Sequence, residues 1–234
     1  MILVAQCREF SDPTLEHEQD CIRRRAPEGL ALKFCTVFDD QVVFDDPHLL
    51  DGITRVIIGG SAAISLAPGH KNNDYTKASI ITERLKPFIL NLIRLKVPTL
   101  GICLGNQLLA QACGATVVFD HHRSESGVYD VTVHDSAHRI FRDVPETFAA
   151  ILGHHDSPDI VPNGSVVLAS NPQGPQAVEY RPGIIGTTFH PELNKADHEF
   201  RMNLFPDYRE EADPNAQSHH AINHAVQVLR NFLA

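Results

Sequence analysis

The chain has 234 residues, of which 43% are hydrophobic and 21% are charged, and its formal net charge is −9. These values are typical of a globular protein with a sizeable core. The negative charge excludes a general nucleic-acid binder, which needs a cationic surface to follow phosphates. The one run of basic residues, Arg23 to Arg25, is interpreted as the solvated end of a helix.

The apolar segments of the chain are short. None approaches the roughly 20 residues that span a bilayer, so no membrane association is expected. The N-terminus, MILVAQCREF, has a short apolar run without a basic leader and is not expected to be a signal peptide. Five cysteines without a disulfide framework of spacings indicate free thiols in a reducing compartment. The sequence therefore predicts a cytoplasmic protein.

Strand-like and helix-like patterns alternate along the chain. Continuous apolar runs predict buried strands at 2–7, 30–38, 55–60 and 97–102, with helices over 14–26, 75–95 and 105–113. Pro87 is expected to kink or restart the second helix. The second half predicts strands at 115–119, 128–134, 147–152, 166–170, 176–180 and 184–189, then a helix over 220–233. Apolar strands without alternation favour a mostly parallel sheet covered on both faces, in one αβα domain spanning 1–234.

A cysteine stands between two glycines where a predicted strand runs directly into a predicted helix. This segment, 101–105, reads Gly-Ile-Cys-Leu-Gly and has the pattern of a nucleophile elbow. The turn is so tight that the flanking positions leave no room for Cβ atoms. The helix start places amide N–H groups and a positive dipole end near Cys103, which favours its reactive thiolate. The other cysteines are interpreted as buried core residues: Cys7, Cys21, Cys35 and Cys113.

A cysteine nucleophile requires a base, and the base requires a group that orients it. An apolar run ends in His190, and Glu192 follows two residues later. Extended residues two positions apart project to the same side, so this carboxylate can reach the imidazole. The sequence therefore predicts a catalytic set of Cys103, His190 and Glu192.

Three motifs, in this order, resemble the class I glutamine amidotransferases. They are VIIGGS at 56–61, GICLGNQ at 101–107 and FHPE at 189–192, and ESGVYDV at 125–131 is similar to the family's strand after the elbow helix. The resemblance runs from about residue 50 to 192 and is greatest to stand-alone, GMP-synthase-like members. It implies a flavodoxin-like, three-layer αβα fold with a central, mostly parallel sheet.

The resemblance also implies glutamine hydrolysis. Cys103 would attack the side-chain amide, and His190, supported by Glu192, would pass the thiol proton to the departing ammonia. The backbone N–H groups of Gly60 and Leu104 would hold the tetrahedral oxyanion. The implied substrate contacts are Gly59, Gln107, Ser126 and Gly127, with Gln107 at the amino-acid end of glutamine.

No cofactor is expected, because the chain has no G-x-x-x-x-G-K-[ST] phosphate loop for ATP. Ammonia is then released or passed to a separate synthetase, the one protein partner that the resemblance suggests. His154, His155 and Asp156 allow two interpretations, a metal site or a polar loop that lines the cleft. The second is favoured because no ligand set with zinc spacing accompanies them.

Two alternatives to glutamine hydrolysis stay open at this point. The first is a hydrolase of another γ-glutamyl amide or a related small amide, with the same catalytic residues. The second is a non-catalytic binding or regulatory module, against which the intact Cys103, His190 and Glu192 weigh. The charged segment 193–218 is either a surface excursion or a lid or docking surface for a partner.

Overall fold

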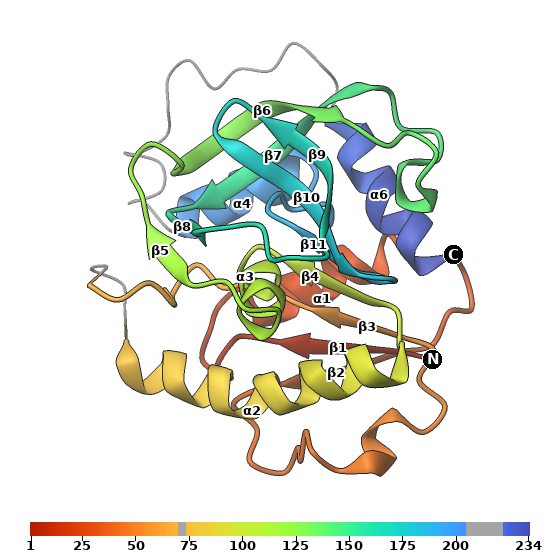
Figure 1. Ribbon diagram of the computed structural model, residues 1–234. Helices are drawn as coiled ribbons and strands as arrows, with labels where there is room; N and C mark the ends of the chain where they lie inside the picture. Colours follow the sequence, from red (N-terminus) through yellow and green to blue (C-terminus); the bar gives the residue numbers. More distant parts are fainter. Residues whose placement is uncertain (70–73, 205–221) are drawn as a thin grey trace.

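The computed structural model describes residues 1–69, 74–204 and 222–234 (Figure 1). A nine-stranded sheet has the order β2-β1-β3-β4-β11-β10-β9-β6-β7, and β5 and β8 form a separate pair. The strands are β1 (Ile2–Gln6), β2 (Leu32–Thr36), β3 (Arg55–Ile58), β4 (Thr99–Ile102), β5 (Val117–Phe119), β6 (Glu125–Val133), β7 (Thr147–His154), β8 (Asp156–Pro158), β9 (Val166–Asn171), β10 (Gly174–Arg181) and β11 (Ile184–Thr187). The helices are α1 (Leu15–Arg23), α2 (Tyr75–Leu95), α3 (Leu104–Ala112), α4 (Lys195–Leu204) and α6 (Asn223–Leu233), with 3-10 turns η1 (Pro47–Leu50) and η2 (Arg139–Phe141).

The sheet has a parallel part and an antiparallel part. From β2 through β1, β3 and β4 to β11, neighbouring strands pair in parallel. From β11 through β10, β9 and β6 to β7, they pair antiparallel. The parallel part forms the core of the fold, with helices on both sides, and the predicted αβα class is confirmed.

Alternate residues of the parallel strands feed two hydrophobic cores. Ile2 and Val4 of β1 belong to the core that includes α6. Leu3 and Ala5 of the same strand belong to the core that includes α2 and α3. Because both faces of the strand are buried, its sequence is continuously apolar, as a doubly covered parallel strand requires.

Helix α2 continues through Pro87, although a restart was one of the two expectations there. A proline removes the hydrogen bond to the carbonyl four residues earlier, which here is that of Glu83. Glu83 and Pro87 are both exposed, so water can bond to the released carbonyl. The helix is held instead by its buried apolar stripe: Ile81, Leu85, Phe88, Ile89 and Leu92.

Helix α4 occupies part of the segment 193–218. Its buried residues are the charged side chains of Asp197 and Arg201, so the helix packs against the domain through ion pairs. The remainder of that segment, 205–218, lies outside the described residues. Within the described ranges, no helix is both long and apolar enough to cross a membrane.

Candidate active site

Cys103 is the turn residue between β4 and α3. Its backbone has φ 51° and ψ −103°, on the positive-φ side that non-glycine residues rarely adopt. Such a conformation costs about 1–3 kcal/mol and persists only where the surroundings fix it. Here the Cys103 N–H donates to the Thr187 carbonyl at 2.8 Å, and the Cys103 carbonyl accepts from the Gln107 N–H at 3.1 Å. The elbow is therefore held from both β11 and α3.

The two glycines of the elbow allow α3 to start against the sheet. A Cβ on Gly105 would lie 2.2 Å from the Ile58 carbonyl oxygen, and one on Gly101 would lie 2.5 Å from the Gly105 carbonyl oxygen. Both obstacles are backbone atoms, which cannot rotate away. The predicted reason for these glycines, a lack of room for Cβ atoms, agrees with these distances.

Gly105→Val is expected to lower the melting temperature and to remove activity, although the Cys103 residue itself is not substituted. The added side chain would push α3 away from the Ile58 carbonyl and move the sulfur with it. Overpacking of this kind typically costs about 1–3 kcal/mol. Thermal unfolding and an amidase assay measure both effects. Gln111→Val is the matched control, since it adds the same side chain to α3 at a partly buried position; equal losses in both variants would contradict this explanation.

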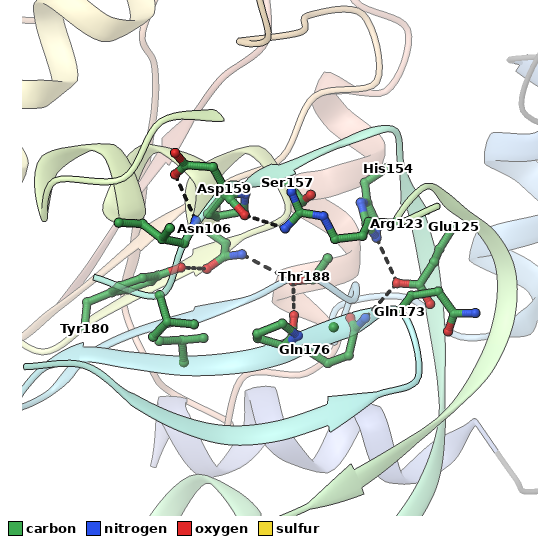
Figure 2. A pocket seen from close by; sticks show the side chains of 16 residues that line it. Asn106, Arg123, Glu125, His154, Ser157, Asp159, Gln173, Gln176, Tyr180 and Thr188 are labelled. Atoms are coloured by element: carbon green, nitrogen blue, oxygen red, sulfur yellow. Dashed lines mark hydrogen bonds and ion pairs between the residues drawn. The ribbon is translucent and has the colours of Figure 1, made fainter. Parts of the chain in front are cut away.

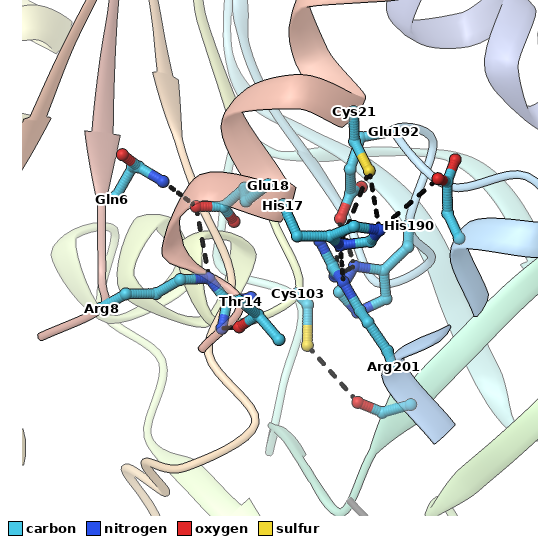
Figure 3. A network of polar contacts seen from close by, with 12 residues as sticks. Gln6, Arg8, Thr14, His17, Glu18, Cys21, Cys103, His190, Glu192 and Arg201 are labelled. Carbon is cyan, nitrogen blue, oxygen red and sulfur yellow. Dashed lines mark hydrogen bonds and ion pairs between the residues drawn. The ribbon is translucent and has the colours of Figure 1, made fainter. Parts of the chain in front are cut away.

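His190 and Glu192 meet as the sequence predicts. His190 Nδ1 lies 2.8 Å from Glu192 Oε1, and the His190 backbone N–H donates to the Ile151 carbonyl at 2.9 Å. Arg201 of α4 joins the same carboxylate, with its Nη1 3.0 Å from Glu192 Oε1 (Figure 3). His190, Glu192 and Arg201 are all buried. The histidine is thus oriented by a carboxylate that also carries a cationic partner.

The charges of this pair shift both pKa values. Burial acts to lower the pKa of His190, but the Glu192 charge and hydrogen bonds with Cys103 and Glu192 outweigh it and raise the pKa from 6.5 to about 9. Burial acts to raise the pKa of Glu192, but His190 and Arg201 outweigh it and lower the pKa from 4.5 to about 2. The imidazolium–carboxylate form is therefore favoured near neutral pH.

Gly60 and Leu104 lie beside the thiol. A Cβ on Gly60 would be 3.3 Å from His190 Cε1 and 3.4 Å from Cys103 Cβ, so the loop after β3 closes on both residues. Leu104 is the first residue of α3, where helix N–H groups have no partner within the helix. These two backbone groups stay the predicted oxyanion donors.

A small polar pocket opens beside the thiol. We name it the amide pocket, and it is lined by Ser61, Ser65, Cys103, Gln107, Gly153 and Asp156 among others. Gln107 Nε2 donates to the Asp156 carbonyl at 3.0 Å, and Asp156 Oδ2 accepts from the Ser65 hydroxyl. Gln107 Oε1 and Asp156 Oδ1 are buried without a hydrogen-bond partner among the described residues. The pocket therefore holds two unsatisfied acceptors, one of them a carboxylate oxygen.

The other predicted substrate contacts lie outside the lining of this pocket. Gly59 faces α1, because a Cβ there would lie 2.8 Å from Glu18 Oε1. Ser126 and Gly127 are on β6, where Ser126 pairs with the pocket residue Gly153. A substrate-binding role for these three residues stays a prediction.

A larger cavity is lined by residues of α3, β6, β8 and β10, among others, and does not include Cys103 among its lining residues (Figure 2). Its non-atom space, open solvent included, is about 580 Å³. Asn106 anchors α3 there: its Oδ1 accepts from the Tyr180 hydroxyl at 2.6 Å, and its Nδ2 donates to Thr188 at 3.3 Å. These two hydrogen bonds hold α3 against β10 and against the segment after β11.

His154 has polar partners on both ring nitrogens. Nε2 lies 3.1 Å from Glu125 Oε2, and Nδ1 lies 3.1 Å from the Asp156 carbonyl. His154, His155 and Asp156 all line the amide pocket, in agreement with the favoured interpretation of a polar loop that lines the cleft.

One group among the described residues combines metal-ligating side chains, namely His17, Cys21 and Asp197 at the contact of α1 with α4. Asp197 already accepts from Arg24 at 2.5 Å and from Arg25 at 3.0 Å. These arginines repel a cation, so the group is better described as an ion-pair network than as a metal site. The interpretation of the arginine run as a solvated helix end is wrong for Arg25, which is buried against Asp197.

Sequence reasoning missed Arg201 as a partner of Glu192, and it left the role of Asp156 open. Arg201 lies nine positions after Glu192, in a helix without an apolar stripe, so no local pattern connects them. For Asp156 the neighbouring sequence, from His154 to Asp159, is itself polar, so nothing in it marks this carboxylate as the buried one.

The chain is similar to several known proteins. The chain is 38% identical over 97 residues to the GMP synthase [glutamine-hydrolyzing] of Thermomicrobium roseum, a match covering 42% of this chain and 18% of that protein. It is 36% identical over 107 residues to one subunit of the glutamine-hydrolysing GMP synthase of Methanococcus vannielii, covering 44% of this chain and 54% of that one. The matched stretch thus spans about half or less of the length of these curated relatives.

A solved structure of a glutamine amidotransferase from Thermotoga maritima shares the fold, with a TM-score of 0.73 at 20% identity. That likeness covers 100% of this chain and 96% of the other. The glutamine amidotransferase class-I family matches residues 54–205, which is more than half of the chain and contains the elbow, the His190–Glu192 pair and Arg201. This chain therefore belongs to the glutamine amidotransferase class-I family.

Proposed function

We propose that this chain hydrolyses the side-chain amide of glutamine through a thioester on Cys103, giving glutamate and ammonia. The observation that carries the proposal is the thiol on a strained elbow beside a buried imidazole–carboxylate pair. A core cysteine needs neither the positive φ nor the charged neighbour, whereas a nucleophile uses both.

In the proposed reaction, the Cys103 sulfur attacks the amide carbon, and His190 carries the thiol proton. His190 then gives this proton to the amide nitrogen as the carbon–nitrogen bond breaks and ammonia leaves. A water molecule, deprotonated by His190, attacks the thioester and releases glutamate and the free thiol. Glu192 holds Nδ1 at 2.8 Å and stabilises the imidazolium that forms in each half-reaction.

The tetrahedral intermediates of both steps carry a negative oxygen. We assign the N–H groups of Gly60 and Leu104 as its donors, because both belong to backbone next to Cys103. Backbone donors fixed before the reaction stabilise the developing charge without reorganisation.

Recognition of the amino-acid end of glutamine is assigned to the amide pocket. Its buried acceptors, Asp156 Oδ1 and Gln107 Oε1, match an α-ammonium group, which carries three donors and a positive charge. A buried carboxylate oxygen without a partner is costly, and a bound ammonium group removes that cost.

Asp156→Asn is expected to raise the KM for glutamine about 10- to 100-fold with a smaller change in kcat, since it removes a charge-assisted hydrogen bond. The measurement is steady-state glutamate release. Glutaramate, which is glutamine without the α-amino group, is the matched control substrate, and the variant should handle it no worse than the wild type does. An equal loss on both substrates would contradict the ammonium assignment.

The acceptor of the ammonia is proposed to be a separate synthetase. The Methanococcus vannielii relative supports this, since its name describes a glutamine-hydrolysing GMP synthase of which that chain is one subunit.

Purified protein incubated with glutamine should release glutamate and ammonia in equal amounts. Failure to release either one, with folded protein at up to millimolar glutamine, would overturn the proposed function.

A further inference from the structure

A second cavity meets the thiol next to the amide pocket. We name it the arginine cavity; its lining includes Arg8, Cys103, Ile151, His190, Leu193 and Arg201, and its non-atom space, open solvent included, is about 500 Å³. The two spaces share Ser61, Ala62, Cys103 and Gly153, but the described lining places His190 only in the arginine cavity and Gln107 only in the amide pocket.

This division assigns the two ends of a substrate. The acyl side lies in the amide pocket, with the ammonium acceptors. The leaving amine receives its proton from His190, so it must depart on the side where His190 is exposed to the substrate. The arginine cavity is therefore the leaving-group side of the site.

Ammonia does not need a cavity of this kind. Its hydrophobic lining includes Ile151 and Leu152 of β7, Leu193 and Met202, next to the polar atoms of the catalytic residues. Apolar walls gain nothing from a small polar product, but they stabilise the apolar side chain of a larger one.

The charges of the cavity define the polar end of such an amine. Among the described residues, no Asp or Glu lines it. Arg8 is paired with Asp12 at 3.1 Å and with Glu18 at 3.3 Å, so its charge is already compensated. Arg201 uses Nη1 for Glu192, while its Nη2 is buried without a hydrogen-bond partner among the described residues. A carboxylate is the group that best satisfies a spare guanidinium N–H.

We propose that the site accepts γ-glutamyl amino acids with an apolar side chain, and that Arg201 binds the carboxylate of the leaving amino acid. This inference rests on the proposed function, since it uses the same thiol and the same base. The sulfur bonds to the carbonyl carbon of the γ-glutamyl amide, the bond from this carbon to nitrogen breaks, and His190 protonates the nitrogen that leaves. Water then cleaves the thioester, so the products are glutamate and the free amino acid, with water as the one co-reactant.

The first experiment needs no variant. The purified full chain is assayed for glutamate release from glutamine, γ-glutamyl-leucine and γ-glutamyl-leucinamide, which lacks only the carboxylate charge. We expect kcat/KM for γ-glutamyl-leucine to exceed that for the leucinamide about 10- to 100-fold, the range of a charge-assisted hydrogen bond. Release from glutamine alone, or equal rates with both leucine compounds, would overturn this inference. Release from none of the three would instead overturn the proposed function.

The second experiment locates the discrimination. Arg201→Gln should reduce the leucine-to-leucinamide ratio to near one, and any effect through Glu192 cancels because both substrates use the same base. Arg24→Gln is the matched control, since Arg24 pairs with Asp197 and does not line the arginine cavity; its ratio should equal that of the wild type. Discrimination that survives in Arg201→Gln would overturn the role of Arg201. If Arg201→Gln does not fold, Met202→Phe serves as a second variant, because the larger side chain fills the cavity. The turnover of γ-glutamyl-leucine should then fall relative to the turnover of glutamine.

Discussion

Cys103→Ser is expected to lower glutamate release by at least about 10³-fold, the scale seen when one member of a cooperating nucleophilic set is removed. A hydroxyl is a much poorer nucleophile beside a base suited to a thiol. The substitution changes one buried atom on a turn that the backbone contacts of Thr187 and Gln107 already hold. The variant should therefore unfold at nearly the wild-type temperature, so that its loss of turnover reports chemistry.

Labelling tests the same residue independently. A diazo-ketone glutamine analogue should add one label, and peptide mapping should place it within 98–117. Burial raises the pKa of the other thiols, to about 12 for Cys21 and about 11 for Cys35, and strongly for Cys7. Those thiols therefore stay protonated and unreactive at neutral pH.

Cys113 provides the matched control, because it follows the last residue of the helix that Cys103 precedes. Burial raises its pKa as well, and it lies outside both pockets at the elbow. Cys113→Ser should keep both the label and turnover. A label on any cysteine other than Cys103, or full activity of Cys103→Ser on every amide tested, would refute the assignment of the nucleophile.

The fold was largely predictable because its signals are local. The strands of the parallel core are continuous apolar runs, and α2 begins and ends at the predicted residues, Tyr75 and Leu95. The elements that escaped prediction lack such a signal. β8 is the three-residue segment Asp-Ser-Pro, and α4 buries charged residues through ion pairs with α1. Ion pairs between residues more than 170 positions apart leave no periodicity in the sequence.

The candidate site likewise has features that could be predicted from the sequence and features that could not. His190 and Glu192 could be paired because they lie two positions apart, and the elbow could be found because its glycines flank the cysteine. The sequence could not distinguish the residues proposed for the acyl side of the substrate from those proposed for its leaving-group side. That division depends on how Gln107, Asp156 and Arg201, from three separate elements, are arranged around one sulfur.

His190→Ala is expected to lower turnover about 10²- to 10⁴-fold, since it removes the group that moves every proton in the proposed reaction. Glu192→Gln should lose less, because an amide oxygen still accepts from Nδ1–H although the charge is gone. Equal activity of His190→Ala and the wild type would refute the assignment of His190 as the general base. Steady-state kinetics at several pH values also separates the two roles of the carboxylate, charge and orientation.

The charge of Glu192 should affect how kcat/KM depends on pH. With the pKa of His190 raised to about 9, chiefly by Glu192 against the opposing effect of burial, the protonated imidazole that the leaving group needs is lost only above that pH. Removing the charge in Glu192→Gln lowers this pKa, so the alkaline limb of kcat/KM should move to lower pH. An alkaline limb that stays in place while turnover falls would mean that Glu192 acts through orientation alone.

The free energy of unfolding should depend on pH through the same two groups, His190 and Glu192, in opposite directions. The pKa of His190 is raised from 6.5 to about 9, so its contribution to the free energy of unfolding is fully present below pH 6.5 and is lost as the pH rises through 9. The pKa of Glu192 is lowered from 4.5 to about 2, so its contribution is present above pH 4.5 and is lost as the pH falls through 2. The melting temperature of the wild type should therefore exceed that of Glu192→Gln most between pH 4.5 and 6.5, and the difference should shrink towards pH 9. A difference that is constant from pH 5 to 9 would show that the pair is not charged in the folded protein, and the imidazolium–carboxylate description of the site would then fail.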